Sequence, residues 1–344
     1  MKNYLRIDWL MANADAVVRY RTQAELMPIS NKASLQGALA ALLVLPQVQK
    51  RLDLLKNLDF NRTHGSDSTH LENVLPMLND FGLYHGMDAF DHAVGNISDI
   101  AEIVLNEGYD KLIAYPFLIR SRFPMSGLMD YAIGRVNTIY SFTRHMDFDI
   151  YDDPQNHKGV PKAFRDRPII KPSIACDTVS GGVNIRVPLI YDIVMFAEIY
   201  DYACAEIREK IDNIIKYTIS PEYDIVVPMY GILPAPPRKY YAMGWDCKKP
   251  FNDGQGYANP NLQRLLLYSR FPAATKSTWF ANAIDYLTQY KTPNSTYIFP
   301  KNYLVEKDCN WVLGMHMSLA ENRRKKQYAE IESTFYMLSL LKCL

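Results

Sequence analysis

The densest group of chemically useful side chains in the sequence is an acidic segment, Arg144–Asp153. Within nine residues it holds one histidine and four carboxylates: His145, Asp147, Asp149, Asp152 and Asp153. Because neighbouring carboxylates repel one another, some of their pKa values rise unless a cation lies between them. Such a segment suits a general acid or a hard metal ion, so we predict Asp147 and Asp149 as catalytic residues. The alternative is a solvated loop whose first acids pair with Arg144, Arg165 or Arg167.

A second candidate site is the aromatic segment Tyr240–Cys247. Gly244 permits a tight turn, Trp245 offers a flat ring, and Asp246 can act as an acid or base, so we predict Asp246 as catalytic. Aromatic loops of this kind line sugar subsites and isoprenoid pockets, where the rings stabilise cationic centres. The residues predicted to bind substrate are Trp245, Tyr240, Tyr241, Tyr151 and Tyr230. In the alternative interpretation, Trp245 only closes one end of the fold.

Four of the seven histidines fall within 29 residues: His64, His70, His85 and His92. The spacing of His85, Asp88 and His92 places them on one face of a helix, where they could bind a divalent metal or act as acid and base. His64 and Asp67 form a loop pair that could line a cavity. The predicted metal ligands are therefore His64, Asp67 and His85, and the alternative is a polar outer face.

His316 and Glu321 precede a run of four cations, Arg323–Lys326. We predict His316 as a further catalytic residue. The cations are expected to begin a C-terminal helix, at the unfavourable positive end of its dipole. A bound anion or the nearby Glu330 would relieve that strain.

Helical periodicity dominates the elements that must position these residues. The predicted helices are residues 8–26, 33–55, 68–81, 86–107, 125–144, 189–217 (one helix or two), 261–271, 277–290 and 323–341. Long irregular stretches at 145–188, 220–260 and 291–310 hold most of the 20 prolines. Residues 225–227 and 297–299 are at most short strands. The pattern predicts an all-α protein with a single domain over 1–344.

Local signals mark several helix ends. Ser30 or Asn31 could cap the helix over 33–55, and Pro46 should kink or divide it. Ser68 and Glu72 are close to a capping box, and Phe81-Gly82 gives a glycine stop signal. Gly108 is expected to end the helix over 86–107.

The helix-loop-helix unit recurs roughly every 45–60 residues, which fits about six helical hairpins closing into a ring. In this rhythm the chain resembles the α/α-toroid superfamily: terpenoid cyclases, protein prenyltransferase β-subunits and six-hairpin glycan enzymes. The stretch Thr69–Leu83 is similar to an inner helix of such a ring that ends in its glycine. Thr296–Pro300, followed by Glu306, Trp311 and Glu332–Phe335, resembles the last prenyltransferase hairpins.

The catalytic signatures of that superfamily are altered in this chain. The acids of Asp147–Asp153 do not have the DxDD spacing of class II cyclases, and Asp152–Asn156 departs from the DDxxD motif that holds magnesium and diphosphate. Asp246 and Cys247 are adjacent, whereas the prenyltransferase zinc site needs Asp-x-Cys and a distant histidine, for which His316 is available. The resemblance implies a fold and a cavity, and it leaves the cofactor unknown, with a divalent metal as the candidate.

Composition argues against several classes of partner. Lys plus Arg total 38 against 37 Asp plus Glu, so the formal net charge of +1 offers no basic field for nucleic acid or an anionic membrane. The longest apolar run, Gly37–Leu45, is far shorter than the ~20 residues of a membrane span. Arg6 and Asp8 interrupt any signal peptide, and five scattered cysteines suit reduced thiols. We therefore expect a cytoplasmic protein.

Tyrosine is the outlier in composition, with 24 copies beside 14 Phe and 4 Trp. We expect it to line a central cavity, capped by the loops 145–188 and 220–260, that binds an isoprenoid or a carbohydrate. Three hypotheses stay open: terpenoid-cyclase-like or prenyltransferase-like chemistry, a six-hairpin glycan hydrolase or lyase with Asp149 and Asp246 as its carboxylate pair, and a non-catalytic small-molecule-binding or scaffold protein.

Overall fold

The computed structural model describes residues 2–27, 31–95, 108–157, 160–176, 184–227, 230–235, 239–242, 247 and 262–344. The N-terminal part is helical: α1 (Lys2–Asn13), α2 (Ala16–Arg21) with a π-helical extension η1 (Thr22–Leu26), α3 (Lys32–Leu43) and α4 (Pro46–Lys56). Asn31 caps α3 by accepting a hydrogen bond from the backbone N–H of Ala33. Pro46 is the first residue of α4, so it divides the predicted helix as expected.

The next helices are α5 (Leu71–Asp80), α6 (Asp88–Val94), α8 (Gly108–Arg120) and α9 (Leu128–Thr143). The predicted capping box is wrong, because His70 is the N-cap residue and Glu72 instead accepts hydrogen bonds from the Gly65 N–H and the Tyr191 hydroxyl. The prediction for Gly108 is also wrong: this glycine begins α8, and Gly95 in a positive-φ conformation ends α6.

The second half contains α10 (Ile190–Ile199), α11 (Ala205–Ile219), α12 (Leu262–Tyr268), α13 (Pro272–Thr275), α14 (Thr278–Thr288) and α15 (Tyr328–Leu341). The basic run Arg323–Lys326 precedes α15 rather than beginning it. Two of its cations are held by carboxylates, Arg323 by Glu306 and Glu332, and Lys325 by Asp15. These ion pairs therefore stabilise the basic segment Arg323–Lys326 in its position before α15.

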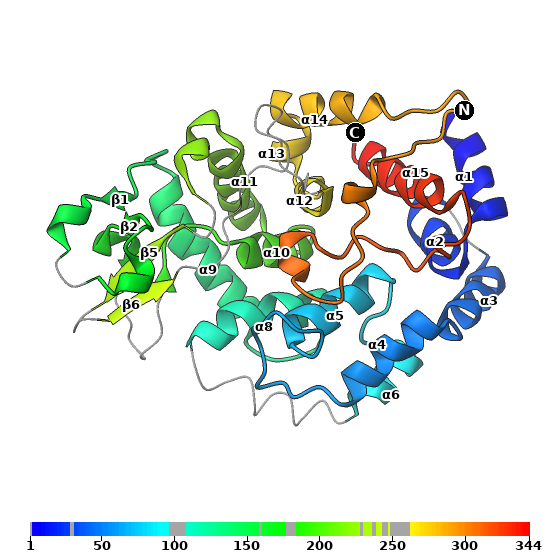
Figure 1. Cartoon of the computed structure of the whole chain (residues 1–344), viewed down its shortest axis with the longest axis horizontal. Helices are drawn as coiled ribbons and strands as arrows, with labels where there is room; N and C mark the ends of the chain where they lie inside the picture. Colours follow the sequence, from blue (N-terminus) through cyan, green and yellow to red (C-terminus); the bar gives the residue numbers. More distant parts are fainter. Residues whose placement is uncertain are drawn as a thin grey trace.

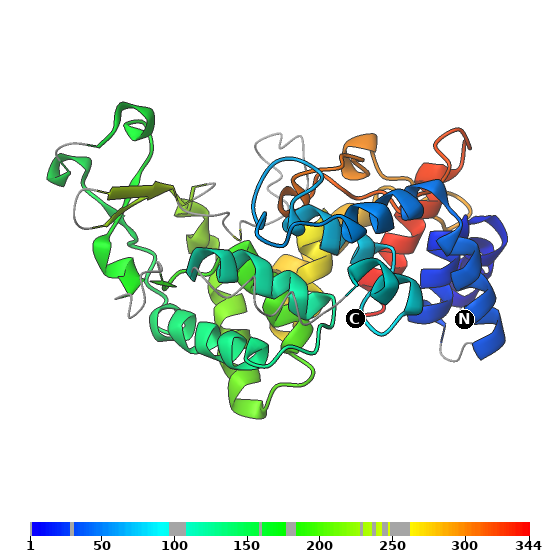
Figure 2. The same ribbon diagram turned by 90° about the horizontal axis from the view of Figure 1, so that it is seen from below.

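A small sheet forms from stretches that the sequence pattern predicts as irregular. Its strand order is β1 (Tyr151–Asp152), β2 (Ile169–Ile170), β5 (Ile232–Ala235) and β6 (Lys239–Ala242), and only the β2–β5 pair is parallel. A separate pair joins β3 (Ala175–Cys176) to β4 (Asn184–Ile185). The four-stranded sheet lies at one end of the long axis, far from α1 and α3 (Figures 1 and 2). Elsewhere the described chain is predominantly helical, which confirms the all-α prediction in its coarse form.

Neighbouring helices follow one another around the core. The helix α8 packs against α5 and α10, α10 packs against α12, α12 against α15, and α15 against α2 and η1 (Figure 1). A second set lies against these: α1 contacts α15, α4 contacts α5, and α9 contacts α10 and α11. Fully buried side chains fill the space between them, among them Leu75, Phe117, Val194, Leu265 and Phe335. Among the described residues, no helix combines the length and apolar character that crossing a membrane requires.

Candidate functional site

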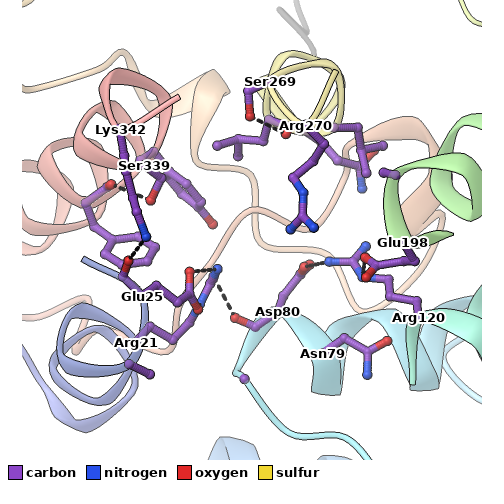
Figure 3. Close-up of a pocket in the computed structure, with 18 of the residues that line it drawn as sticks. Arg21, Glu25, Asn79, Asp80, Arg120, Glu198, Ser269, Arg270, Ser339 and Lys342 are labelled. Atoms are coloured by element: carbon purple, nitrogen blue, oxygen red, sulfur yellow. Dashed lines mark hydrogen bonds and ion pairs between the residues drawn. The ribbon is translucent and has the colours of Figure 1, made fainter. Parts of the chain in front are cut away.

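The described residues line an open cavity of about 550 Å³, a size typical of small-molecule sites (Figure 3). Its walls come from the C-terminal ends of six helices. Each contributes residues from its last turn or just beyond it: Arg21 (α2), Asp80 (α5), Arg120 (α8), Glu198 (α10), Leu267 (α12) and Ser339 (α15). Segments from both ends of the chain therefore meet in one place.

Asp80 is the centre of the charged network in this cavity. Its carboxylate accepts hydrogen bonds from Arg120 Nη2 at 2.7 Å and from Trp311 Nε1 at 2.6 Å. Its backbone carbonyl accepts a third from Arg21 Nη1 at 2.9 Å. The Arg120 guanidinium also lies over the Trp311 ring, 4.7 Å from its centroid. Asp80 thus ties α2, α5, α8 and the segment around Trp311 together.

A second ion pair lies on the α2 side of the cavity. Arg21 binds Glu25 through both carboxylate oxygens, at 2.6 and 2.9 Å, and its guanidinium covers the Phe335 ring at 4.8 Å. Burial alone would lower the pKa of Arg21, but the attached Glu25 carboxylate raises it above the ordinary value. This arginine is therefore permanently charged and already neutralised by its partner.

Positive charge exceeds negative charge in the lining. Five cationic side chains (Arg21, Arg120, Arg122, Arg270 and Lys342) face three carboxylates (Glu25, Asp80 and Glu198). Glu25 forms an ion pair with Arg21, and Asp80 forms one with Arg120. Glu198 lies 4.0 Å from Nε of the same Arg120. The other three cations have no carboxylate partner in the lining: Arg122 has none among the described residues, Lys342 donates to the Glu25 carbonyl oxygen, and Arg270 pairs at 3.4 Å with Asp201, which lies outside the lining. Figure 3 shows Arg270 extending from the end of α12 toward Asp80.

Aromatic residues complete the wall. Burial raises the pKa of the Tyr20 hydroxyl and holds that of Tyr336 well above its ordinary value. Tyr336 donates a hydrogen bond to the carbonyl oxygen of Met317 at 2.8 Å. Both phenols are therefore neutral near pH 7, and they act as polar-edged walls, not as bases.

The predicted catalytic acids do not line this cavity. Asp147 and Asp149 are exposed and directly precede β1, in the sheet region of Figure 1. Asp147 accepts a hydrogen bond from the N–H of Asp149, and Asp149, whose side chain is 76% exposed, pairs with Lys171 at 2.5 Å. This arrangement matches the alternative of a solvated loop, although its cation is Lys171 and not an arginine.

The predicted aromatic site is only partly within the described residues. Trp245 and Asp246 lie outside them, and Tyr240 and Tyr241 are described as backbone in β6, paired with Pro234 and Leu233. The side chains of the other two form structural hydrogen bonds: the Tyr151 hydroxyl accepts from Val227 N–H at 2.9 Å, and the buried Tyr230 hydroxyl donates to Pro188 O at 2.6 Å. Neither of these two tyrosines lines the cavity.

The three predicted metal ligands bind three different partners. His64 Nδ1 lies 2.7 Å from Glu72, and that hydrogen bond raises the pKa of His64. Hydrogen bonds from Thr69 lower the pKa of Asp67 to about 2. His85 pairs with Asp91 and precedes α6, so it does not lie on a helical face with His92. Within the described part of the chain, no group of three His, Cys, Asp or Glu side chains is placed to hold a metal ion.

His316, the fourth predicted catalytic residue, is a core histidine. It is 3% exposed, its Nδ1 lies 2.9 Å from the carbonyl oxygen of Lys307, and its ring meets the edge of Phe81. Burial lowers the pKa of His316, and the positive charge of Arg51 lowers it further. The imidazole is therefore neutral and donates its Nδ1 proton to Lys307 O.

Sequence reasoning missed the residues that do line the cavity. Nothing in the sequence around Arg21, Arg120 or Arg270 sets them apart from ordinary surface residues, and Asp80 lies unmarked within the stretch Thr69–Leu83. The available signal was positional: basic residues recur in or just after the last turns of the helices. Comparisons of this chain with protein-family models, curated proteins and solved structures find no match.

Proposed function

We propose that the cavity at the six helix ends binds a small organic anion. The observation that carries the proposal is the excess of cations in the lining, five against three carboxylates. Among the described residues Arg122 has no carboxylate partner, Lys342 donates to the Glu25 carbonyl oxygen, and Arg270 pairs with the exposed Asp201, at 3.4 Å and outside the lining. A guanidinium presents a planar fork of N–H donors that matches phosphate and carboxylate oxygens. All three side chains are exposed, so an anion that enters the cavity can reach them.

The lining also favours an apolar portion in the ligand. Leu26, Leu266, Leu267 and Met317 lie among the charged residues, together with Phe335. A phosphorylated molecule with a hydrocarbon part would match both kinds of wall. Among the open hypotheses, this combination supports an isoprenoid diphosphate, and hence prenyltransferase-like or cyclase-like chemistry, over a neutral glycan.

We further propose that the six helices are the inner helices of an α/α toroid. The sequence of contacts α5, α8, α10, α12, α15 and α2 supports this arrangement, and the Arg21 hydrogen bond to the Asp80 carbonyl joins the last helix to the first. The helices α1, α4, α9 and α11 would then form the outer layer. In such a ring, residues from every hairpin reach one central cavity.

A competing role for the same cations is purely structural. Helix C-termini carry partial negative charge, and a nearby cation stabilises each by about 0.3–1 kcal/mol. If that were their whole role, removing one would lower the stability of the fold and would have no effect on any ligand. Binding and stability must therefore be measured together.

Titration calorimetry with inorganic pyrophosphate, farnesyl diphosphate and the neutral sugar maltotetraose tests the proposal. We expect both diphosphates to bind in a saturable manner, the sugar not to bind, and R270Q to weaken diphosphate binding about tenfold or more. R144Q is the matched control, because Arg144 is an exposed arginine at the end of α9, outside the cavity. Absence of diphosphate binding, or equal effects of R270Q and R144Q, would contradict the proposal.

A further inference from the structure

Two adjacent helices, α5 and α8, end in the same backbone motif at the cavity. At the end of α5, Leu83 N–H donates to Leu78 O at 3.0 Å and Gly82 N–H donates to Asn79 O at 2.9 Å. At the end of α8, Phe123 N–H donates to Leu118 O at 3.1 Å and Arg122 N–H donates to Ile119 O at 2.9 Å. Both pairs of bonds are those of a Schellman motif, which requires a left-handed residue after the helix.

The residue in the left-handed position differs between the two ends. Gly82 has φ +85°, and a Cβ there would come within 3.0 Å of the Tyr20 ring, so glycine suits both the conformation and the space. Arg122 has φ +63° in the equivalent position of α8. Because a Cβ is disfavoured in this conformation, glycine would serve the backbone of α8 better than arginine does.

The strained backbone position places the side chain of Arg122 at the cavity. Its guanidinium carbon lies 3.4 Å from the centroid of the Tyr84 ring, at the wall of the cavity. No carboxylate of the described residues pairs with it, and the side chain is exposed. A guanidinium stacked face-on against a ring keeps its N–H donors in its own plane, pointing away from the ring. On the exposed side chain of Arg122, those donors are available to an anion.

Tyr84 and Arg122 are held in register by cross-links between the two helix ends. His85 N–H donates to Ser121 O at 2.9 Å, and Ser121 Oγ donates to Asn79 Oδ1 at 3.2 Å. The Arg120–Asp80 ion pair, between the last residues of α8 and α5, completes the connection. The stacked pair is therefore a preorganised element and not a chance surface contact.

We propose that Arg122 is a ligand-binding residue of the cavity, whose guanidinium, stacked on Tyr84, receives the phosphate or carboxylate group of the ligand. This inference rests on the proposed anion-binding function. Backbone strain retained beside a site is characteristic of residues selected for function over stability. The same strain would have no purpose if the α8 end served only the fold, because the neighbouring α5 end achieves the same motif with glycine.

The decisive variant is R122G, which removes the side chain and relieves the backbone at once. We expect R122G to bind inorganic pyrophosphate at least tenfold more weakly than the wild type, with a midpoint of thermal unfolding that is unchanged or higher. R122K should bind at an intermediate level, because lysine keeps the charge without the planar fork. R144Q again serves as the control and should bind as the wild type does.

The possible outcomes separate the two proposals. If the wild type does not bind pyrophosphate, the proposed function fails and the inference fails with it. If the wild type binds and R122G binds equally well, the cavity binds anions without Arg122 and this inference alone is overturned. If R122G loses binding together with several degrees of unfolding midpoint, Arg122 supports the fold, and the inference is again overturned.

Discussion

The acidic segment 145–153 and the cavity at the helix ends both concentrate charge, but they do so in opposite ways. The segment gathers its carboxylates within a few consecutive residues, and the structure leaves Asp149 exposed against Lys171. The cavity gathers its charges from residues as distant in sequence as Arg21 and Lys342, and it buries much of them against Trp311 and Phe335. Charge density along the chain therefore differs from charge density in space, and only the second brings charges of distant residues into one site.

The largest expected effect follows from removing the central charge of the cavity. Asp80→Asn leaves Arg120 and the Trp311 N–H facing a neutral amide, so the free energy of unfolding should fall by about 3 kcal/mol. Urea denaturation at pH 7 measures the change. Asp149→Asn is the matched control in the acidic segment. A loss below ~1 kcal/mol for Asp80→Asn would show that the network around it contributes little.

Glu321 lies outside both regions and shows what burial does to the pKa of a carboxylate. Glu321 is 1% exposed, and burial, reinforced by the charge of Asp15, raises its pKa to about 8. The folded state therefore holds a proton that the unfolded state releases above about pH 4.5, so this group's contribution to stability falls as the pH rises from there to about 8.

The variant Glu321→Gln should remove that part of the pH dependence. The wild type is expected to lose on the order of 3 kcal/mol of unfolding free energy between pH 5 and pH 9, and the variant to lose less. Some slope remains in both proteins, because burial also raises the pKa of Glu332, to about 7. Superimposable pH profiles of wild type and variant in chemical denaturation would refute the assignment.

A smaller change tests one hydrogen bond of the Asp80 network. Trp311→Phe keeps a ring beneath Arg120 but removes the indole N–H that donates to Asp80 at 2.6 Å. We expect a loss of about 2 kcal/mol, from the unmade hydrogen bond and the smaller side chain. Thermal unfolding of Trp279→Phe provides the control, since Trp279 lies outside this cavity. Equal losses in the two variants would indicate that ring size alone matters at Trp311.

The smallest effect is expected in the acidic segment itself. Asp149→Asn breaks an exposed pair with Lys171, and such pairs contribute at most about 1 kcal/mol to the free energy of unfolding. Diphosphate binding should also be unchanged, because Asp149 is not part of the cavity lining. A loss of diphosphate binding in calorimetry would show that the acidic segment, and not only the cavity, takes part in binding the ligand.

The periodic helices were predictable, because a one-sided apolar stripe is a local signal: α9 and α15 fall within the predicted ranges, and Pro46 divides its helix as its missing N–H requires. The helix α8 was not predictable, because Gly108 at its start and Pro116 inside it are signals that ordinarily end helices. The helix forms nevertheless, because it packs against α5 and α10.

The cavity was the least predictable feature. Arg120 and Asp80 acquire their roles only when two helix ends meet, and nothing in either local sequence encodes that meeting. The predicted aromatic residues are not those of this cavity: its lining contains Tyr20, Tyr84 and Tyr336, and no described tyrosine from the loops 145–188, 220–260 or 291–310. Whether a Trp, Arg or Tyr side chain lines this cavity depends on contacts between residues that lie far apart in the sequence.

A crystal structure of the protein soaked in inorganic pyrophosphate would show whether the cavity at the six helix ends binds an anion. We expect a pyrophosphate in the cavity, with oxygens at about 2.7–3.0 Å from the guanidinium nitrogens of Arg122 and Arg270. A cavity that holds only water, with pyrophosphate absent or bound to exposed cations elsewhere, would contradict it.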